Sequence, residues 1–135
     1  MNKTYNRLYD SESIIRDTNC YMAEYCSDKF HTWFDKDIYP VEDYYFLAKF
    51  CYEHFDVWFD KKTFPVKHYY FLAKYYSKHF DVWFDKDIFP MEDYNFLAKY
   101  CSDKFHTWYD KKTFPQYYYN FLVKYCSEYL DVWNK

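Results

Sequence analysis

Apolar residues recur along this chain at helical spacing. In segment 90–108 they fall at positions i, i+3, i+4, i+7, i+11 and i+14, and they are Tyr94, Leu97, Ala98, Cys101, Phe105 and Trp108. This spacing puts them on one face of an α-helix. The polar residues Glu92, Asn95, Lys99, Asp103 and His106 follow the opposite face. The pattern predicts a helix of about 18 residues from Pro90 to about Trp108.

The same pattern returns every 25 residues. The tryptophans mark the period most clearly, at Trp33, Trp58, Trp83, Trp108 and Trp133. We divide the chain into repeats 10–34, 35–59, 60–84, 85–109 and 110–134, after an N-terminal extension at residues 1–9. The first repeat is eroded, since Ile15 stands where the other four have proline. The sequence therefore predicts an all-α fold with five tandem single-helix repeats of about 25 residues, in one domain spanning residues 10–135.

A longer period of 50 residues overlies the first. Repeats two and four open with Asp-Lys-Asp-Ile at Asp35 and Asp85, whereas repeats three and five open with Asp-Lys-Lys-Thr at Asp60 and Asp110. This alternation favours a helical hairpin as the larger element, with neighbouring helices antiparallel. We expect either a small α-solenoid or an up-and-down helical array. Pro90 suits the first turn of a helix, and Asp87 or Thr113 is the expected cap.

Composition narrows the class of protein. Aromatic residues make up 30% of the chain and glycine is absent, which excludes a disordered chain and glycine-rich phosphate loops. The net charge of −3 is no basic nucleic-acid footprint. No run of 18 apolar residues and no signal peptide are visible, so we expect a cytoplasmic protein in a reducing compartment, with no membrane partner. The bias toward Lys, Tyr, Phe and Asp hints at an AT-rich viral, phage or parasite genome.

Residues that often carry chemistry have simpler explanations here. Four cysteines, Cys26, Cys51, Cys101 and Cys126, share one offset on the apolar face, which is typical of buried thiols. The histidines form no i, i+4 pair, and the acidic turns lack the glycine of a calcium loop. No nucleophile lies beside a base in any motif. We therefore expect no catalytic residues, no metal and no cofactor.

Two surfaces remain as binding hypotheses. In repeat five, tyrosines replace charged residues at the helix start, and the chain stops soon after its last tryptophan. Tyr117, Tyr118 and Trp133 are therefore the candidate protein interface, for a partner or a homodimer through the C-terminal repeat. The alternative is a ladder that binds single-stranded nucleic acid, made of Lys49, Lys74, Lys99, Lys124, Tyr45 and Tyr70.

We favour a non-catalytic protein-binding module, in its sharpest form a small viral, phage or parasite protein that blocks or scaffolds a partner. An enzyme whose site assembles only in three dimensions is the third hypothesis.

Overall fold

The computed structural model of this chain describes residues 11–134, so the predicted N-terminal extension at residues 1–9 lies outside the described part. Every regular element in residues 11–134 is helical, and none of them is a strand. The predicted all-α repeat fold is confirmed. The chain forms two compact units, Met1–Pro65 and Val66–Lys135, called here the N-terminal and C-terminal units. The single domain at residues 10–135 stays a prediction.

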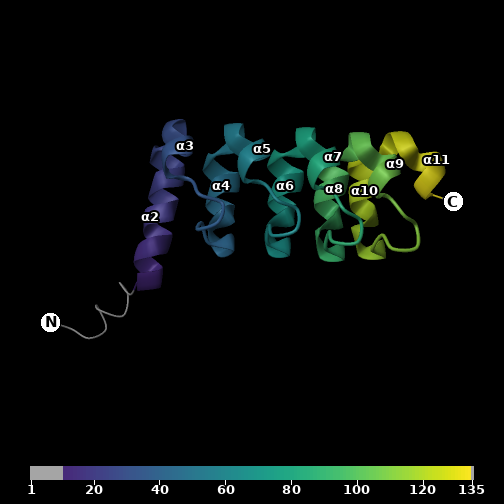
Figure 1. Cartoon of the computed structure of the whole chain (residues 1–135). Helices are drawn as coiled ribbons and strands as arrows, with labels where there is room; N and C mark the ends of the chain where they lie inside the picture. The colour runs from purple at the N-terminus through teal and green to yellow at the C-terminus, as the bar shows by residue number, and fades with distance from the viewer. Residues whose placement is uncertain (1–10, 135) are drawn as a thin grey trace. The chain divides into compact units, whose positions relative to one another are not determined.

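The helices follow one another in a fixed order within each unit (Figure 1). In the N-terminal unit they are α2 (Ser11–Tyr25), η1 (Ser27–Lys29), α3 (Phe30–Trp33), η2 (Val41–Asp43), α4 (Tyr44–Phe50), η3 (Tyr52–His54) and α5 (Phe55–Trp58). In the C-terminal unit they are η4 (Val66–His68), α6 (Tyr69–Tyr75), η5 (Ser77–His79), α7 (Phe80–Trp83), η6 (Met91–Asp93), α8 (Tyr94–Tyr100), η7 (Ser102–Lys104), α9 (Phe105–Trp108), η8 (Gln116–Tyr118), α10 (Tyr119–Tyr125), η9 (Ser127–Tyr129) and α11 (Leu130–Trp133). The η elements are 3₁₀ turns that lead directly into the α-helices.

Each repeat contains a pair of helices rather than the single helix that the apolar spacing predicts. In repeat four the first helix ends before Cys101, whose φ of −126° and ψ of 35° are not helical. The Cys101 carbonyl oxygen accepts the Lys104 backbone N–H at 3.0 Å and the Trp108 indole N–H at 2.7 Å. A carbonyl oxygen has two lone pairs, so these two donors satisfy it fully. The hydrogen bond from the indole therefore stabilises the interruption of the helix at Cys101.

The same indole bond recurs in the other repeats. Its distances, from the tryptophan nitrogen to the carbonyl oxygen seven residues earlier, are 2.7 Å for Trp33–Cys26, 2.8 Å for Trp58–Cys51, 2.6 Å for Trp83–Tyr76 and 2.9 Å for Trp133–Cys126. The tryptophan period of the sequence is thus a period of helix breaks. The break is one residue long, and 3₁₀ turns continue the chain, so the apolar stripe stays on the buried side across it.

Equivalent helices run parallel within a unit, not antiparallel as the period of 50 residues predicts. The Cys101 Sγ lies 3.6 Å from the Ala73 carbonyl oxygen, and the Cys126 Sγ lies 3.6 Å from the Ala98 carbonyl oxygen. Between repeats four and five, Glu92 contacts Tyr118 and Lys99 contacts Tyr125, and both pairs are 26 residues apart. Two contacts of equal separation, one near the start and one near the end of the same two helices, require parallel helices. The predicted alternation is wrong because the short second helix and the turn return the chain to the end where the first helix began.

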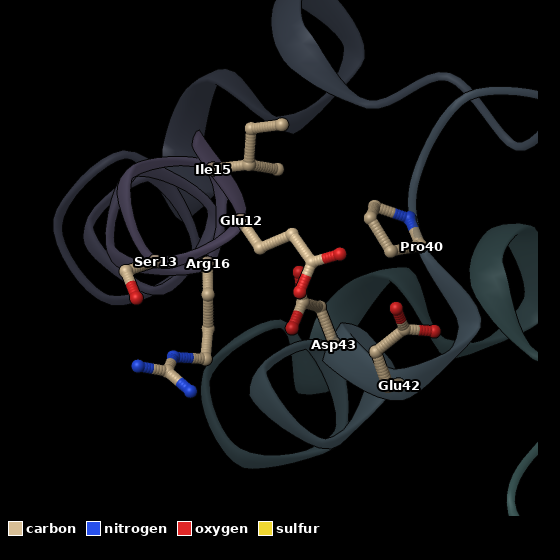
Figure 2. Close-up of a pocket in the computed structure, with 7 residues that line it drawn as sticks. All are labelled: Glu12, Ser13, Ile15, Arg16, Pro40, Glu42 and Asp43. Carbon is tan, nitrogen blue, oxygen red and sulfur yellow. The ribbon is translucent and has the colours of Figure 1, made fainter. Parts of the chain in front are cut away.

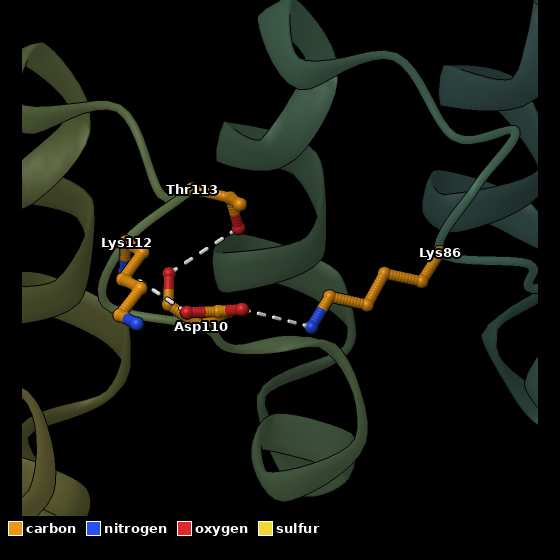
Figure 3. Close-up of polar contacts among 4 residues, drawn as sticks. All are labelled: Lys86, Asp110, Lys112 and Thr113. Carbon is orange, nitrogen blue, oxygen red and sulfur yellow. Dashed lines mark hydrogen bonds and ion pairs between the residues drawn. The ribbon is translucent and has the colours of Figure 1, made fainter.

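Acidic residues shape the turns rather than cap the helices. Asp110 accepts the Lys112 backbone N–H on its Oδ1 at 2.9 Å, which closes an Asx turn. The predicted caps Asp87 and Thr113 are wrong, because Pro90 and Pro115 occupy the N-cap positions without any side-chain cap. The free Oδ2 of Asp110 lies 3.1 Å from the Lys86 Nζ and so links repeats four and five (Figure 3). The Lys112 backbone N–H, followed by Lys86, lowers the pKa of Asp110.

The core is the predicted apolar stripe. In repeat four its six residues are all buried, at Tyr94, Leu97, Ala98, Cys101, Phe105 and Trp108. Aromatic rings fill the space between repeats: the Phe105 and Tyr129 rings stack at 4.5 Å between centroids, and Tyr94 packs edge-on against Phe114 at 6.1 Å. Large rings that bury this much area provide most of the stabilisation in short repeats.

Candidate binding surface

The four predicted ladder lysines occupy one position on α4, α6, α8 and α10, and all four are exposed. Each ammonium group lies over the ring of the next residue in the chain. The Nζ-to-centroid distances are 5.3 Å for Lys49–Phe50, 5.1 Å for Lys74–Tyr75, 5.1 Å for Lys99–Tyr100 and 5.3 Å for Lys124–Tyr125. These are cation–π distances, so the rings hold the charges at defined positions on the helix surface.

In the C-terminal unit these pairs join into a continuous row. The Lys99 Nζ also lies 6.0 Å from the ring centroid of Tyr125, which bridges α8 and α10. The pKa of Lys74 is raised, first by the adjacent Tyr75 side chain and then by Tyr100 on α8. We call this surface the lysine–aromatic row, and its residues are Lys74, Tyr75, Lys99, Tyr100, Lys124 and Tyr125.

Among the described residues 11–134, the ammonium groups of the row have no carboxylate within ion-pair distance. The ion pairs of the C-terminal unit use other lysines, Lys86 with Asp110 and Lys104 with Asp81. Within residues 66–134 no Asp or Glu lies at ion-pair distance from the three row lysines. The row therefore offers positive charge and aromatic surface together, a combination suited to an anionic ligand with apolar or planar groups.

The predicted ladder tyrosines are not the rings over which the lysine ammonium groups lie. Tyr70 is half-buried, with its ring 5.5 Å from that of Phe96, and Tyr45 is half-buried beside Phe46 at 6.2 Å. The rings that accompany the lysines are Phe50, Tyr75, Tyr100 and Tyr125, which the sequence analysis missed. The signal that identifies them is a lysine followed directly by an aromatic residue at one offset in four repeats.

The three predicted C-terminal interface residues have different environments. Tyr117 is 71% exposed. Tyr118 is half-buried and donates its hydroxyl to the Glu92 carbonyl oxygen at 2.6 Å, so it joins repeats four and five. Trp133 is only 5% exposed, and its indole closes the helix break of its own repeat. Of these three side chains, that of Tyr117 is the most exposed.

Two apolar neighbours extend the exposed C-terminal surface. Val123 is 61% exposed and Leu130 is 48% exposed. The residues one repeat earlier, Ala98 and Phe105, are fully buried because repeat five covers them. Val123 and Leu130 therefore lie on the face of repeat five that corresponds to the covered face of repeat four. Tyr117, whose equivalent Glu92 is exposed, lies at the start of the same repeat, and the three exposed side chains are together called the C-terminal face.

A surface cavity of about 350 Å³ lies in the N-terminal unit. Its lining residues are Glu12, Ser13, Ile15, Arg16, Pro40, Glu42 and Asp43. Figure 2 shows Glu12 and Arg16 extending from α2, and Glu42 and Asp43 from η2, around this cavity. Asp43 is buried and accepts the Asn19 side-chain amide at 3.0 Å, which joins the first two repeats. This hydrogen bond explains the buried carboxylate as a structural group.

The buried thiols are poor nucleophiles. Burial raises the pKa of Cys51 and of Cys101 to about 12 and that of Cys126 to about 11. At neutral pH these groups are protonated, and the thiolate is the reactive form. All five cysteines are free. The shared cysteine offset predicts buried thiols, and Cys51, Cys101 and Cys126 are buried.

Residues 11–134 contain neither a metal-binding cluster nor a membrane-spanning helix. No group of three or more His, Cys, Asp or Glu side chains in that range is arranged to hold a metal ion. None of the helices in that range has the length and apolar character needed to cross a bilayer.

Comparisons with protein-family models, curated proteins and solved structures find no match to this chain.

Proposed function

We propose that this chain is a non-catalytic helical-repeat module that binds a partner protein through the lysine–aromatic row. The observation that carries the proposal is the set of three exposed ammonium groups that lie over tyrosine rings with no carboxylate partner. Tyrosine is among the residues that dominate the binding energy of protein interfaces, and the lysines add charge that selects an anionic partner. The buried, free thiols support a reducing compartment such as the cytoplasm.

A second candidate is binding of single-stranded nucleic acid by the same row. Lysines that alternate with rings are also typical of surfaces that follow a phosphate backbone and stack bases. The charge of the whole chain favours a protein, because its net charge of −3 repels a long polyanion. A short acidic segment of a protein can contact the row alone.

Charge reversal on the row tests the proposal. We expect Lys74→Glu, Lys99→Glu and Lys124→Glu together to weaken binding to peptides selected from a displayed library by at least about tenfold, or about 1.4 kcal/mol. The matched control reverses three exposed lysines outside the row, Lys67, Lys78 and Lys111. It changes net charge equally and should leave affinity within about twofold.

Fluorescence anisotropy with labelled peptides and a labelled oligothymidylate measures both ligand classes side by side. If selected peptides bind both triple variants equally, the row is not the binding surface. If the oligonucleotide binds and loses affinity steeply with salt, while no peptide does, the nucleic-acid candidate replaces the proposal.

The C-terminal face is a second contact, and we expect it to form a homodimer. Large exposed apolar side chains, here Tyr117, Val123 and Leu130, favour self-association. Light scattering on a size-exclusion column, over a tenfold concentration range, should give the dimer mass. Tyr117→Glu should give the monomer of 17.2 kDa, while Tyr25→Glu, at an equally exposed tyrosine on α2, should not. A monomer at every concentration for the unaltered chain contradicts this prediction.

A further inference from the structure

The lysine–aromatic row has a regular alternation of charge and ring. Lys99 lies between the rings of Tyr100 and Tyr125, at 5.1 and 6.0 Å from their centroids. Lys124 lies over the same Tyr125 ring, so ring and ammonium alternate from α8 to α10. Lys74 over Tyr75 adds an equivalent pair on the parallel helix α6.

The spacing of this order follows from helix packing. The helices α6 and α8 pack against each other, as do α8 and α10. Axes of packed helices lie about 8–10 Å apart, so equivalent lysines repeat at about that interval. A polyproline II helix rises about 3.1 Å per residue and has three residues per turn, so every third side chain repeats at about 9 Å on one side.

An α-helical ligand needs more residues than an extended one to reach all three lysines. At about 1.5 Å per residue it must span some 14 residues to present three carboxylates at this interval, and isolated helices of that length are marginal in water. A polyproline II segment needs about seven residues and is already extended before it binds. Aromatic rings that line a surface are also the usual recognition element for proline in this conformation.

We propose that the row binds an acidic polyproline II segment with a carboxylate at every third residue and proline between. Each carboxylate meets one of Lys74, Lys99 and Lys124, and the intervening prolines pack on the rings of Tyr100 and Tyr125. This inference rests on the proposed function, because it names the partner chemistry of the same surface. The charge complementarity comes from the three ammonium groups without a carboxylate partner.

Two labelled nine-residue peptides of identical composition test the spacing. One has glutamate at its first, fourth and seventh positions and proline elsewhere, and the other has its three glutamates adjacent. Anisotropy with the full chain should show the spaced peptide binding at least about tenfold more tightly. Lys99→Gln should remove most of that difference, and Lys111→Gln, at an exposed lysine outside the row, should leave it unchanged.

The outcomes separate the inference from the proposed function. Equal affinity for the two peptides, or tighter binding of a labelled oligothymidylate, overturns the inference. If the spaced peptide does not bind but library peptides bind in a row-dependent way, the inference fails and the proposed function stands. If library peptides also ignore charge reversal on the row, both fail.

Discussion

Trp108→Phe is expected to lower the free energy of unfolding by about 2–3 kcal/mol. The substitution removes the indole N–H that lies 2.7 Å from the Cys101 carbonyl oxygen. Loss of one hydrogen bond to a buried carbonyl costs about 1–1.5 kcal/mol, and the smaller ring leaves a cavity that costs about as much again. Trp108 is fully buried, so the site cannot relax by admitting water easily.

Urea unfolding followed by circular dichroism measures this change without relying on tryptophan emission. Phe105→Leu is the matched control, because it removes a buried ring beside Trp108 and no hydrogen bond. Hydrogen exchange should also show faster exchange of the Lys104 amide in Trp108→Phe, since that amide shares the carbonyl. A cost for Trp108→Phe no larger than that of Phe105→Leu means that the indole does not hold the break.

Ala98→Val is expected to destabilise the chain by about 1–3 kcal/mol through overpacking. Ala98 is fully buried, and its carbonyl oxygen lies 3.6 Å from the Cys126 Sγ of the next repeat. Two additional methyl groups at this point of closest approach force α8 and α10 apart. The displaced Cys126 thiol should then react faster with a disulfide reagent.

The chain supplies the control for this change at the same offset. Position 123 already carries valine and is 61% exposed, so Val123→Ala should change the free energy of unfolding by less than about 0.5 kcal/mol. Urea midpoints of the two variants, with thiol reactivity of Cys126, make the comparison. Equal effects for Ala98→Val and Val123→Ala contradict the close approach of α8 and α10.

The sequence predicts the lysines of the candidate surface but not the rings beside them. The ladder lysines are exposed and equivalent, as their offset predicts. Their ring partners are not predicted by that offset, because the pattern pairs each lysine with an aromatic residue one helical turn earlier, as at Tyr45 and Tyr70. A lysine side chain folds back over its neighbour, so the adjacent ring becomes its partner. Trp133 shares the offset of Trp108 on the apolar stripe, which favours burial, but the bond from its indole to the Cys126 carbonyl oxygen is not visible in that pattern.

The amino-acid sequence alone determined the helical class, the 25-residue period and the buried stripe. These follow from the spacing of apolar residues, which any helix, broken or whole, must bury on one side. Tertiary structure decided that each repeat is a pair of helices and that equivalent helices run parallel. The physical reason is a bond that local periodicity does not encode: the indole of Trp108 satisfies the Cys101 carbonyl seven residues away, which makes an interruption of the helix stable.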